Sequence, residues 1–225
     1  MKLLKSKLFV IILALGVLSF NIQLAAAEVF VDLHAGLASG SYENLTALAP
    51  AGKSIERVDL GNSFTIGYRL GYWFKGFRWA GVAVEASHFK HDIQKDGFDY
   101  GHLRITPVSS MLMFRLPLLK KDNYSAGELL LYGGIGPGLF LSSIKVDYSL
   151  FSGSGKYSER AVDIGLDMRA GIEKMISENI SLFCEYRYTD FKPDFKNDDD
   201  SGNSVKIETE VNTHHVLIGF SYHYN

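Results

Sequence analysis

Residues 162–191 read VDIGLDMRAGIEKMISENISLFCEYRYTDF, and this stretch decides the fold. From Val162 to Ile172 every second residue is apolar, while the residues between them are small or charged. After a turn at residues 177–179 the alternation resumes and continues to Thr189. Side chains alternate between the two faces of a β-strand, so the stretch predicts a β-hairpin with one apolar and one charged face.

Such a hairpin fits two architectures. A soluble sandwich turns its apolar face inward, whereas a transmembrane barrel turns apolar side chains toward lipid and charged side chains toward its lumen. Residues 62–74 favour the barrel, because six large apolar side chains share one face of that strand. The last strand repeats the pattern, and its expected lipid-facing residues are Val216, Ile218, Phe220, Tyr222 and Tyr224.

The N-terminus predicts export from the cytoplasm. Three lysines precede an apolar run over residues 8–20, and three alanines follow at residues 25–27. This is the pattern of a secretory signal peptide that is cleaved after Ala27, and the run is short for a retained membrane anchor. We therefore expect a signal peptide over residues 1–27 and one barrel domain over residues 28–225.

Composition narrows the class of protein further. The formal net charge of −2 gives no sign of nucleic-acid binding, and the single cysteine, Cys184, cannot form an internal disulfide. Glycine is frequent, with 22 residues, whereas proline occurs only 5 times. The glycines of residues 133–138 lie inside a strand pattern and do not match a phosphate-binding loop. These features favour an all-β protein without a cofactor.

The whole chain predicts eight strands with connections that alternate in length. The expected strands are residues 29–38, 62–74, 80–87, about 104–118, 129–148, the two strands of the 162–191 hairpin, and the strand that ends at residue 225. Long connections are expected at residues 39–61, 91–102, 151–156 and 196–203. Short turns and long loops alternate in this way in outer-membrane barrels, with the turns in the periplasm and four loops outside. The predicted fold is a transmembrane, eight-stranded, antiparallel up-and-down β-barrel.

Three details of the strands stay open. Pro107 is expected to make the start of its strand irregular, and the phase of residues 129–148 is ambiguous. The apolar residues before Asn212 lie on odd positions and those after it on even positions. A bulge, or a strand that reaches above the membrane, would explain this change. Tyr72 and Tyr224 are expected near the periplasmic rim, as part of an aromatic girdle.

Four pieces of the sequence carry a family resemblance. They are WAGVAVEASHF at residues 79–89, LYGGIGPGLFL at 131–141, LFCEYRYTDF at 182–191 and HHVLIGFSYHY at 214–224. With them the chain resembles the OmpA-type, opacity-protein-like, eight-stranded outer-membrane barrels. The resemblance implies a location in the outer membrane of a Gram-negative bacterium, contact with its lipids and lipopolysaccharide, and recognition of the last strand by the barrel-assembly machinery.

The charged face of each strand is expected to line the lumen. The predicted lumen charge network is Arg69, Glu85, Asp163, Asp167, Arg169, Glu173, Glu185 and Arg187. Asp32, His34, Arg115, His215 and His223 share the inward phase. Eight strands leave an interior that side chains just fill, and arginines pair bidentately with carboxylates. We expect pairs that plug and stiffen the barrel, with a gated ion path as the alternative.

The sequence predicts a monomer with a structural or surface-interaction role and a possible ligand at its loops. The alternatives are a small, porin-like, low-conductance channel and a lipid-modifying enzyme. An enzyme would need a nucleophile and a base on one face, but Ser87 and His88 are neighbours in a strand and point to opposite faces. No catalytic residue is predicted. A metal site at His88, His91 and Asp92, or a cation at Asp198–Asp200, is weighed against the commoner solvated side chains, and no metal is predicted.

Overall fold

The computed structural model describes residues 28–40, 42–49, 52–119, 127–147, 156–198 and 204–224. The predicted signal peptide at residues 1–27 lies outside the described residues. So do residues 120–126, residue 148 of the predicted strand 129–148, residues 149–155, residues 199–203 of the acidic loop, and Asn225. Within the described ranges, no helix has the length and apolar character needed to cross a membrane.

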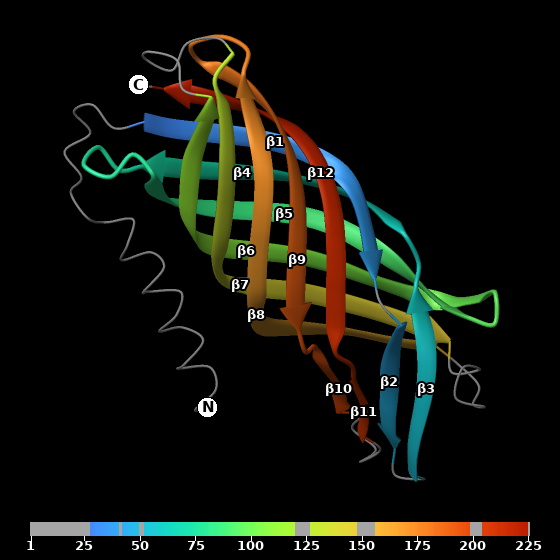
Figure 1. Cartoon of the computed structure of the whole chain (residues 1–225). Helices are drawn as coiled ribbons and strands as arrows, with labels where there is room; N and C mark the ends of the chain where they lie inside the picture. Colours follow the sequence, from blue (N-terminus) through green and yellow to red (C-terminus); the bar gives the residue numbers. More distant parts are fainter. Residues whose placement is uncertain are drawn as a thin grey trace.

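Eight long strands close into an antiparallel barrel (Figure 1). In order around the wall they are β5 (Ala80–Lys95), β4 (Ser63–Trp73), β1 (Glu28–Gly40), β12 (Val211–Tyr224), β9 (Ile180–Phe191), β8 (Lys156–Met175), β7 (Leu129–Asp147) and β6 (Phe98–Leu119). Strand β6 also pairs with β5, and this pairing closes the ring. The predicted eight-stranded up-and-down barrel is confirmed.

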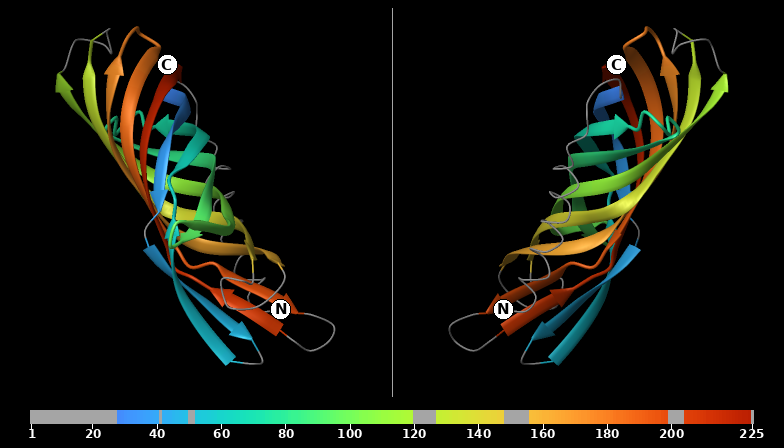
Figure 2. Two further views of the ribbon diagram at one scale, coloured as in Figure 1. Left: turned by 90° about the vertical axis from the view of Figure 1, so that its right-hand side faces the viewer. Right: turned by 90° about the vertical axis from the view of Figure 1, so that its left-hand side faces the viewer.

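Four shorter strands extend the barrel at one end. They are β2 (Tyr42–Ala49), β3 (Gly52–Leu60), β10 (Asp194–Asp198) and β11 (Ser204–Glu208), paired in the order β10-β11-β2-β3. Figures 1 and 2 show them together beyond the barrel, on the side away from the last residues of β12. We call this side the loop end, and the side with Glu28 and Tyr224 the terminal end. The prediction of one long loop over residues 39–61 was wrong, and residues 196–198 of the other predicted loop belong to β10.

The predicted loop at residues 91–102 is also a hairpin. Strand β5 runs to Lys95 and β6 starts at Phe98, with these two residues paired. Asp96 and Gly97 form the turn between them, with φ angles of 53° and 80°. A two-residue type I′ turn needs positive φ at both positions, and Asp-Gly is a preferred sequence for it. The loop was predicted because the outward residues of 91–102 are polar. Strands β5 and β6 nevertheless continue beyond the part of the wall that has apolar outward residues.

The register stays constant where the sequence left the phase open. Pro107 lies inside β6 in register with Phe140 of β7, and the register shift between these two strands falls instead at residues 117–119. In β7 the large even-numbered residues, such as Tyr132 and Phe140, are buried inside the barrel. The irregularity expected at Pro107 is confined to the β5 side, where the pairing passes from Ala86↔Val108 to Phe89↔Ile105 without a pair at Pro107.

Strand β12 also keeps a single register. Its pairing with β9 is continuous from Val211↔Phe191 to Tyr222↔Ile180, so the strand contains no bulge near Asn212. Val211 is buried in the barrel interior, together with Ile207 of β11. The apolar residues change face because their surroundings change, while the strand itself continues unaltered.

The wall near the terminal end has apolar side chains outside. Val216, Ile218, Phe220, Tyr222 and Tyr224 are all exposed on the outer surface, with Ile218 at 66 %. Tyr72 and Tyr224 flank Val29 on its two neighbouring strands, which places these tyrosines together at this end. The aromatic side chains thus gather where the two ends of the barrel sequence meet.

The wall near the loop end has apolar side chains inside. We call this buried cluster the loop-end core, and its members are Ala38, Val58, Leu60, Phe89, Ile93, Leu103, Ile105, Phe140, Ile144, Val146, Tyr157, Ala161, Phe191, Phe195, Ile207 and Val211. Phe140 and Phe191 stack with ring centroids 4.2 Å apart. The outward side chains here include the exposed Lys90 and Arg104. This half of the barrel therefore has the polarity of a soluble protein.

Candidate functional site

The strand registers bring charged side chains to the middle of the lumen. Asp32 of β1 lies opposite Arg69 of β4, and Arg69 lies opposite Glu85 of β5. On the far wall, Arg169 of β8 lies opposite Arg187 of β9. All five point inward because they share the inward phase of their strands, and each is buried.

Arg69 connects three strands. Its Nε donates to Asp32 Oδ2 at 2.5 Å, and its Nη1 donates to Glu185 Oε2 at 2.8 Å. The hydroxyl of Tyr132 donates to the same oxygen of Glu185 at 2.8 Å. These contacts join β1, β4 and β9 through one guanidinium, with the Tyr132 ring beside it at 5.6 Å.

Arg169 is held by three carboxylates. It donates to Asp167 Oδ1 at 2.9 Å and to Glu185 Oε1 at 3.1 Å, and it also donates to Glu85. Because its side chain is fully buried, these carboxylates replace the water that a guanidinium would otherwise bind. Arg169 therefore lies at the centre of the network.

Arg187 crosses the lumen to the opposite wall. Its Nη2 lies 2.6 Å from Asp167 Oδ2, while its Nη1 donates to Ser87 Oγ at 2.6 Å and lies 3.1 Å from Glu85 Oε1. Ser109 donates to Asp167 at 2.7 Å. Strands β9 and β5 are four positions apart in either direction around the ring, so this contact spans the barrel.

These residues form one buried network, which we call the central network. It contains three arginines and four carboxylates: Arg69, Arg169, Arg187, Asp32, Glu85, Asp167 and Glu185. With every group ionised, three positive and four negative charges give a formal sum of −1. Loss of one arginine would leave two positive charges against four negative ones, whereas loss of one carboxylate would leave three of each. The loss of an arginine therefore leaves the larger uncompensated charge in the buried network.

Two residues of the predicted lumen network lie elsewhere. Asp163 is half-buried and lies opposite Phe140, four residues from Asp167 toward the loop end. Glu173 lies at the terminal end, where its Oε1 is 2.8 Å from His223 Nε2 and accepts from Ser181. Arg169 and Arg187 take their partners from the other three carboxylates, Glu85, Asp167 and Glu185, because the rise of the strand carries Glu173 beyond their reach.

A second polar group lies around His223, and we call it the rim cluster. His223 Nδ1 is 2.7 Å from Glu28 Oε1, so the ring bridges Glu28 and Glu173. Arg115 binds both oxygens of Glu28, at 2.7 and 2.5 Å. Each imidazole nitrogen of His223 faces a carboxylate. Both nitrogens can donate a hydrogen bond when the ring is protonated to the imidazolium. Glu28 was missed in the sequence, although it shares the inward phase of Asp32.

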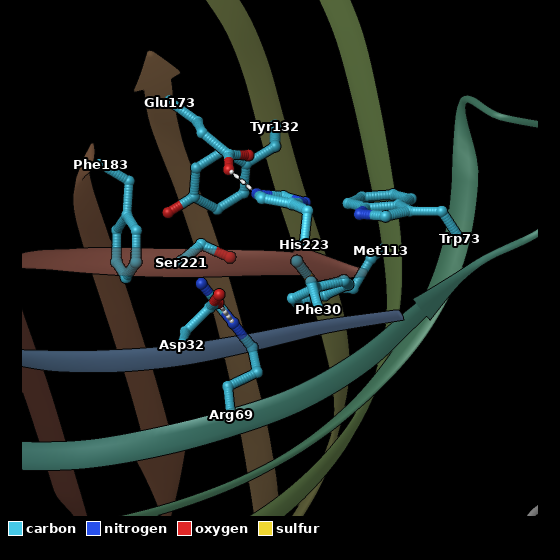
Figure 3. Close-up of a pocket in the computed structure, with 10 residues that line it drawn as sticks. All are labelled: Phe30, Asp32, Arg69, Trp73, Met113, Tyr132, Glu173, Phe183, Ser221 and His223. Atoms are coloured by element: carbon cyan, nitrogen blue, oxygen red, sulfur yellow. Dashed lines mark hydrogen bonds and ion pairs between the residues drawn. The ribbon is translucent and has the colours of Figure 1, made fainter. Parts of the chain in front are cut away.

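A small cavity lies between the two groups (Figure 3). Figure 3 shows the Asp32–Arg69 pair on one side and the Glu173–His223 pair on the other. Aromatic side chains form much of the lining between them, including Phe30 and Trp73, whose rings stack at 5.4 Å. The charged groups of the lumen are thus divided by an aromatic layer.

The residues weighed for catalysis or metal binding are divided between the faces of β5. Ser87 and His91 are buried inside, where His91 Nδ1 donates to the carbonyl oxygen of Gly61 at 2.6 Å. His88 lies outside, 2.8 Å from Thr106 Oγ1, and Asp92 pairs with Lys90. Across the described part of the chain, no group of three His, Cys, Asp or Glu side chains could hold a metal ion.

The histidine pair of β12 is divided in the same way. His215 is buried and hydrogen-bonds Thr213 through Nε2 at 2.7 Å, whereas His214 is on the outer wall against Tyr186. Of the acidic loop weighed as a cation site, Asp199 and Asp200 lie outside the described residues. The structure therefore brings together the lumen charges and leaves the other weighed residues apart.

Comparison with known proteins identifies the relatives of this fold. A family model described as the outer membrane protein beta-barrel domain matches residues 10–224. The outer membrane protein OprG of Pseudomonas aeruginosa is 15 % identical, with a TM-score of 0.60 over 89 % of this chain and 97 % of that one. Neisserial surface protein A is 15 % identical, with a TM-score of 0.47 over 86 % and 96 %. The search of curated proteins gave no match.

Proposed function

Because the chain belongs to the outer membrane protein β-barrel family, we propose that it is a closed barrel with a structural or surface-interaction role. The family places it in the outer membrane of a Gram-negative bacterium. The proposal includes cleavage of residues 1–27 on export, insertion as a monomer through the barrel-assembly machinery, and contact with lipopolysaccharide. The loop end then faces the exterior, since short turns of such barrels lie in the periplasm.

The contact between Arg187 and the Glu85–Ser87 segment carries the proposal of closure. It joins opposite walls of the barrel, and the side chains of Arg187 and Glu85 have no exposed surface. Eight strands enclose a space that side chains just fill, so a buried network at this level leaves no continuous water path. The loop-end core supports the same conclusion, because a second, apolar layer lies beyond the network.

A closed lumen leaves the loop end as the functional surface. The four strands β2, β3, β10 and β11 reach beyond the barrel and pair with one another across two different connections. Binding residues concentrate on segments that a rigid scaffold holds in place, and a barrel is such a scaffold. We propose that any ligand of the exterior is bound by this extension.

A low-conductance channel is the second candidate, and the cavity lined by Asp32, Arg69 and Glu173 favours it. Planar-bilayer recording of the intact protein separates the two functions. The closed barrel predicts no unitary current steps above the lipid baseline at moderate voltage. Reproducible steps that scale with salt concentration would instead establish the channel and overturn closure.

A further inference from the structure

Basic side chains line the outer wall on four neighbouring strands. The register places Lys90 of β5 directly opposite Arg104 of β6, and Arg104 opposite Ser143 of β7. Ser143 in turn lies opposite Arg160 of β8. The next outward residue along β7 is Lys145, and all four basic residues are exposed. Three strand spacings of about 4.8 Å place the whole group within about 15 Å across the wall.

This group lies just beyond the apolar band of the wall. On β8 the band runs from Val162 to Ile172, and Arg160 is the next outward residue toward the loop end. Ten residues at about 3.3 Å cover about 33 Å of strand, or about 25 Å of depth at the usual tilt. That depth equals the apolar band of an outer-membrane barrel, so Arg160 lies at the level of lipid headgroups.

The other strands repeat this placement. Lys90 follows the outward Ala86 after one intervening outward residue, and Arg104 stands in the same relation to Val108. Because barrel strands tilt, the height of these residues changes from one strand to the next. On each strand, however, the basic residue lies one or two outward positions beyond the last apolar outward residue. The group therefore follows the edge of the membrane.

The positive charge of the group is mostly uncompensated. Lys90 pairs with Asp92 at 2.8 Å, but within the described ranges Arg104, Lys145 and Arg160 form no ion pair. Charges of Lys90, Arg104 and Lys145 all act on the ring of His102, so they lie close to one another. On the opposite wall, the outward residue that follows the apolar Leu37 of β1 toward the loop end is the uncharged Ser39.

We propose that Lys90, Arg104, Lys145 and Arg160 form a binding site for the lipid A phosphates of lipopolysaccharide. The site rests on the proposed orientation, in which the loop end meets the outer leaflet. Arginine forks bind phosphate oxygens in pairs, and lysine adds a mobile positive charge. The acyl chains would lie on the apolar wall below, against Leu141 and Val162, which are exposed next to the group.

Native mass spectrometry of the full chain in detergent tests the site. The probes are purified lipopolysaccharide, the same lipopolysaccharide with its lipid A phosphates removed, and phosphatidylglycerol. We expect the intact lipopolysaccharide to bind most tightly. Each basic residue contributes about fivefold, so the triple variant Arg104→Gln, Lys145→Gln, Arg160→Gln should bind about 100-fold more weakly.

A matched control lies on β8 itself. Lys174 is exposed on the outer face beyond the other edge of the apolar band. Lys174→Gln should leave binding unchanged, while Arg160→Gln alone should weaken it about fivefold. Heat-modifiable gel migration reports whether each variant is folded. If the triple variant fails to fold, the binding of Arg160→Gln and Lys174→Gln is compared instead.

Three results would overturn the site. They are equal binding by the variants and the wild type, equal binding of dephosphorylated lipopolysaccharide, and equal binding of phosphatidylglycerol. The lumen plays no part in this test. A negative result would therefore leave the proposal of a closed lumen, which bilayer recording tests, unaffected. Labelling of the loop end from the periplasmic side alone would instead overturn the orientation on which the site rests.

Discussion

The two halves of strand β5 follow one alternation with opposite chemistry. Near the terminal end, Val82 and Val84 face outward and Glu85 faces the lumen. Near the loop end, Phe89 is buried inside and Lys90 faces outward. The register of β5 with β4 and β6 shows no shift between these positions. The solvent outside the wall therefore decides which face is apolar: lipid around the first half, and water around the second.

This comparison has consequences for stability that differ between the halves. In the membrane half, the interior is held by ion pairs whose loss leaves a buried charge. In the loop-end half, it is held by apolar packing whose loss leaves a cavity. Four substitutions measure the difference by the free energy of unfolding from urea titration, in detergent micelles for the two interior residues and in lipid bilayers for the two outward residues.

Arg169→Met should have the largest effect, about 3–5 kcal/mol. It removes the partner of Glu85, Asp167 and Glu185 and leaves two positive charges against four negative ones. Glu185→Gln is the matched control, because it leaves three of each. A cost for Glu185→Gln equal to that of Arg169→Met would show that charge balance does not govern the network.

Phe140→Ala should cost about 3 kcal/mol, because it removes one ring of the Phe140–Phe191 stack and opens a cavity. Phe220, which is exposed on the lipid side of β12, provides the comparison. Phe220→Ala only exchanges a contact with detergent, so its cost should be clearly smaller. If the two costs were alike, the loop-end core would not be a packed interior.

Leu166→Arg should cost about 2–4 kcal/mol, because Leu166 lies near the middle of the apolar band of β8. The cost should appear in lipid bilayers, as slower insertion and a lower unfolding midpoint. An unchanged midpoint would place Leu166 outside the hydrocarbon.

Ser158→Arg should have the smallest effect, within about 0.5 kcal/mol, since it adds a charge to an outward position already in water. Ser158 is on the same strand and the same face as Leu166. The two substitutions therefore differ in whether lipid or water surrounds the new arginine, and not in the strand or the face that carries it. A cost above 1 kcal/mol, on the scale of about 2–4 kcal/mol for charge in lipid, would extend the membrane past Arg160.

The exchange of apolar and polar faces between the two halves of the barrel also explains which strands could be predicted from the sequence. The hairpin of residues 162–191 and the strand ending at Tyr224 lie largely within lipid, so their alternation revealed both the strands and their inward faces. Residues 91–102 have polar outward residues, and this hairpin was mistaken for a loop. The apparent phase change at Asn212 had the same cause.

The lumen was predictable in outline only. Alternation placed Arg69, Glu185 and Arg187 inside, but contacts between strands as distant as β5 and β9 depend on barrel closure and stagger. Glu173 was grouped with the wrong arginines because phase gives the face of a strand and not the depth along it. Glu28 was overlooked because it is the first residue after the predicted cleavage site.

The outward face of β8 offers the most direct test of the reversal. In a Cys184→Ser background, single cysteines at residues 158, 160, 164, 166 and 170 would carry spin labels in lipid bilayers. Accessibility to a water-soluble nickel reagent should be high at residues 158 and 160, while accessibility to oxygen should be high from 164 to 170. Water access at residue 164, or lipid access at residue 158, would contradict a membrane edge beside Arg160.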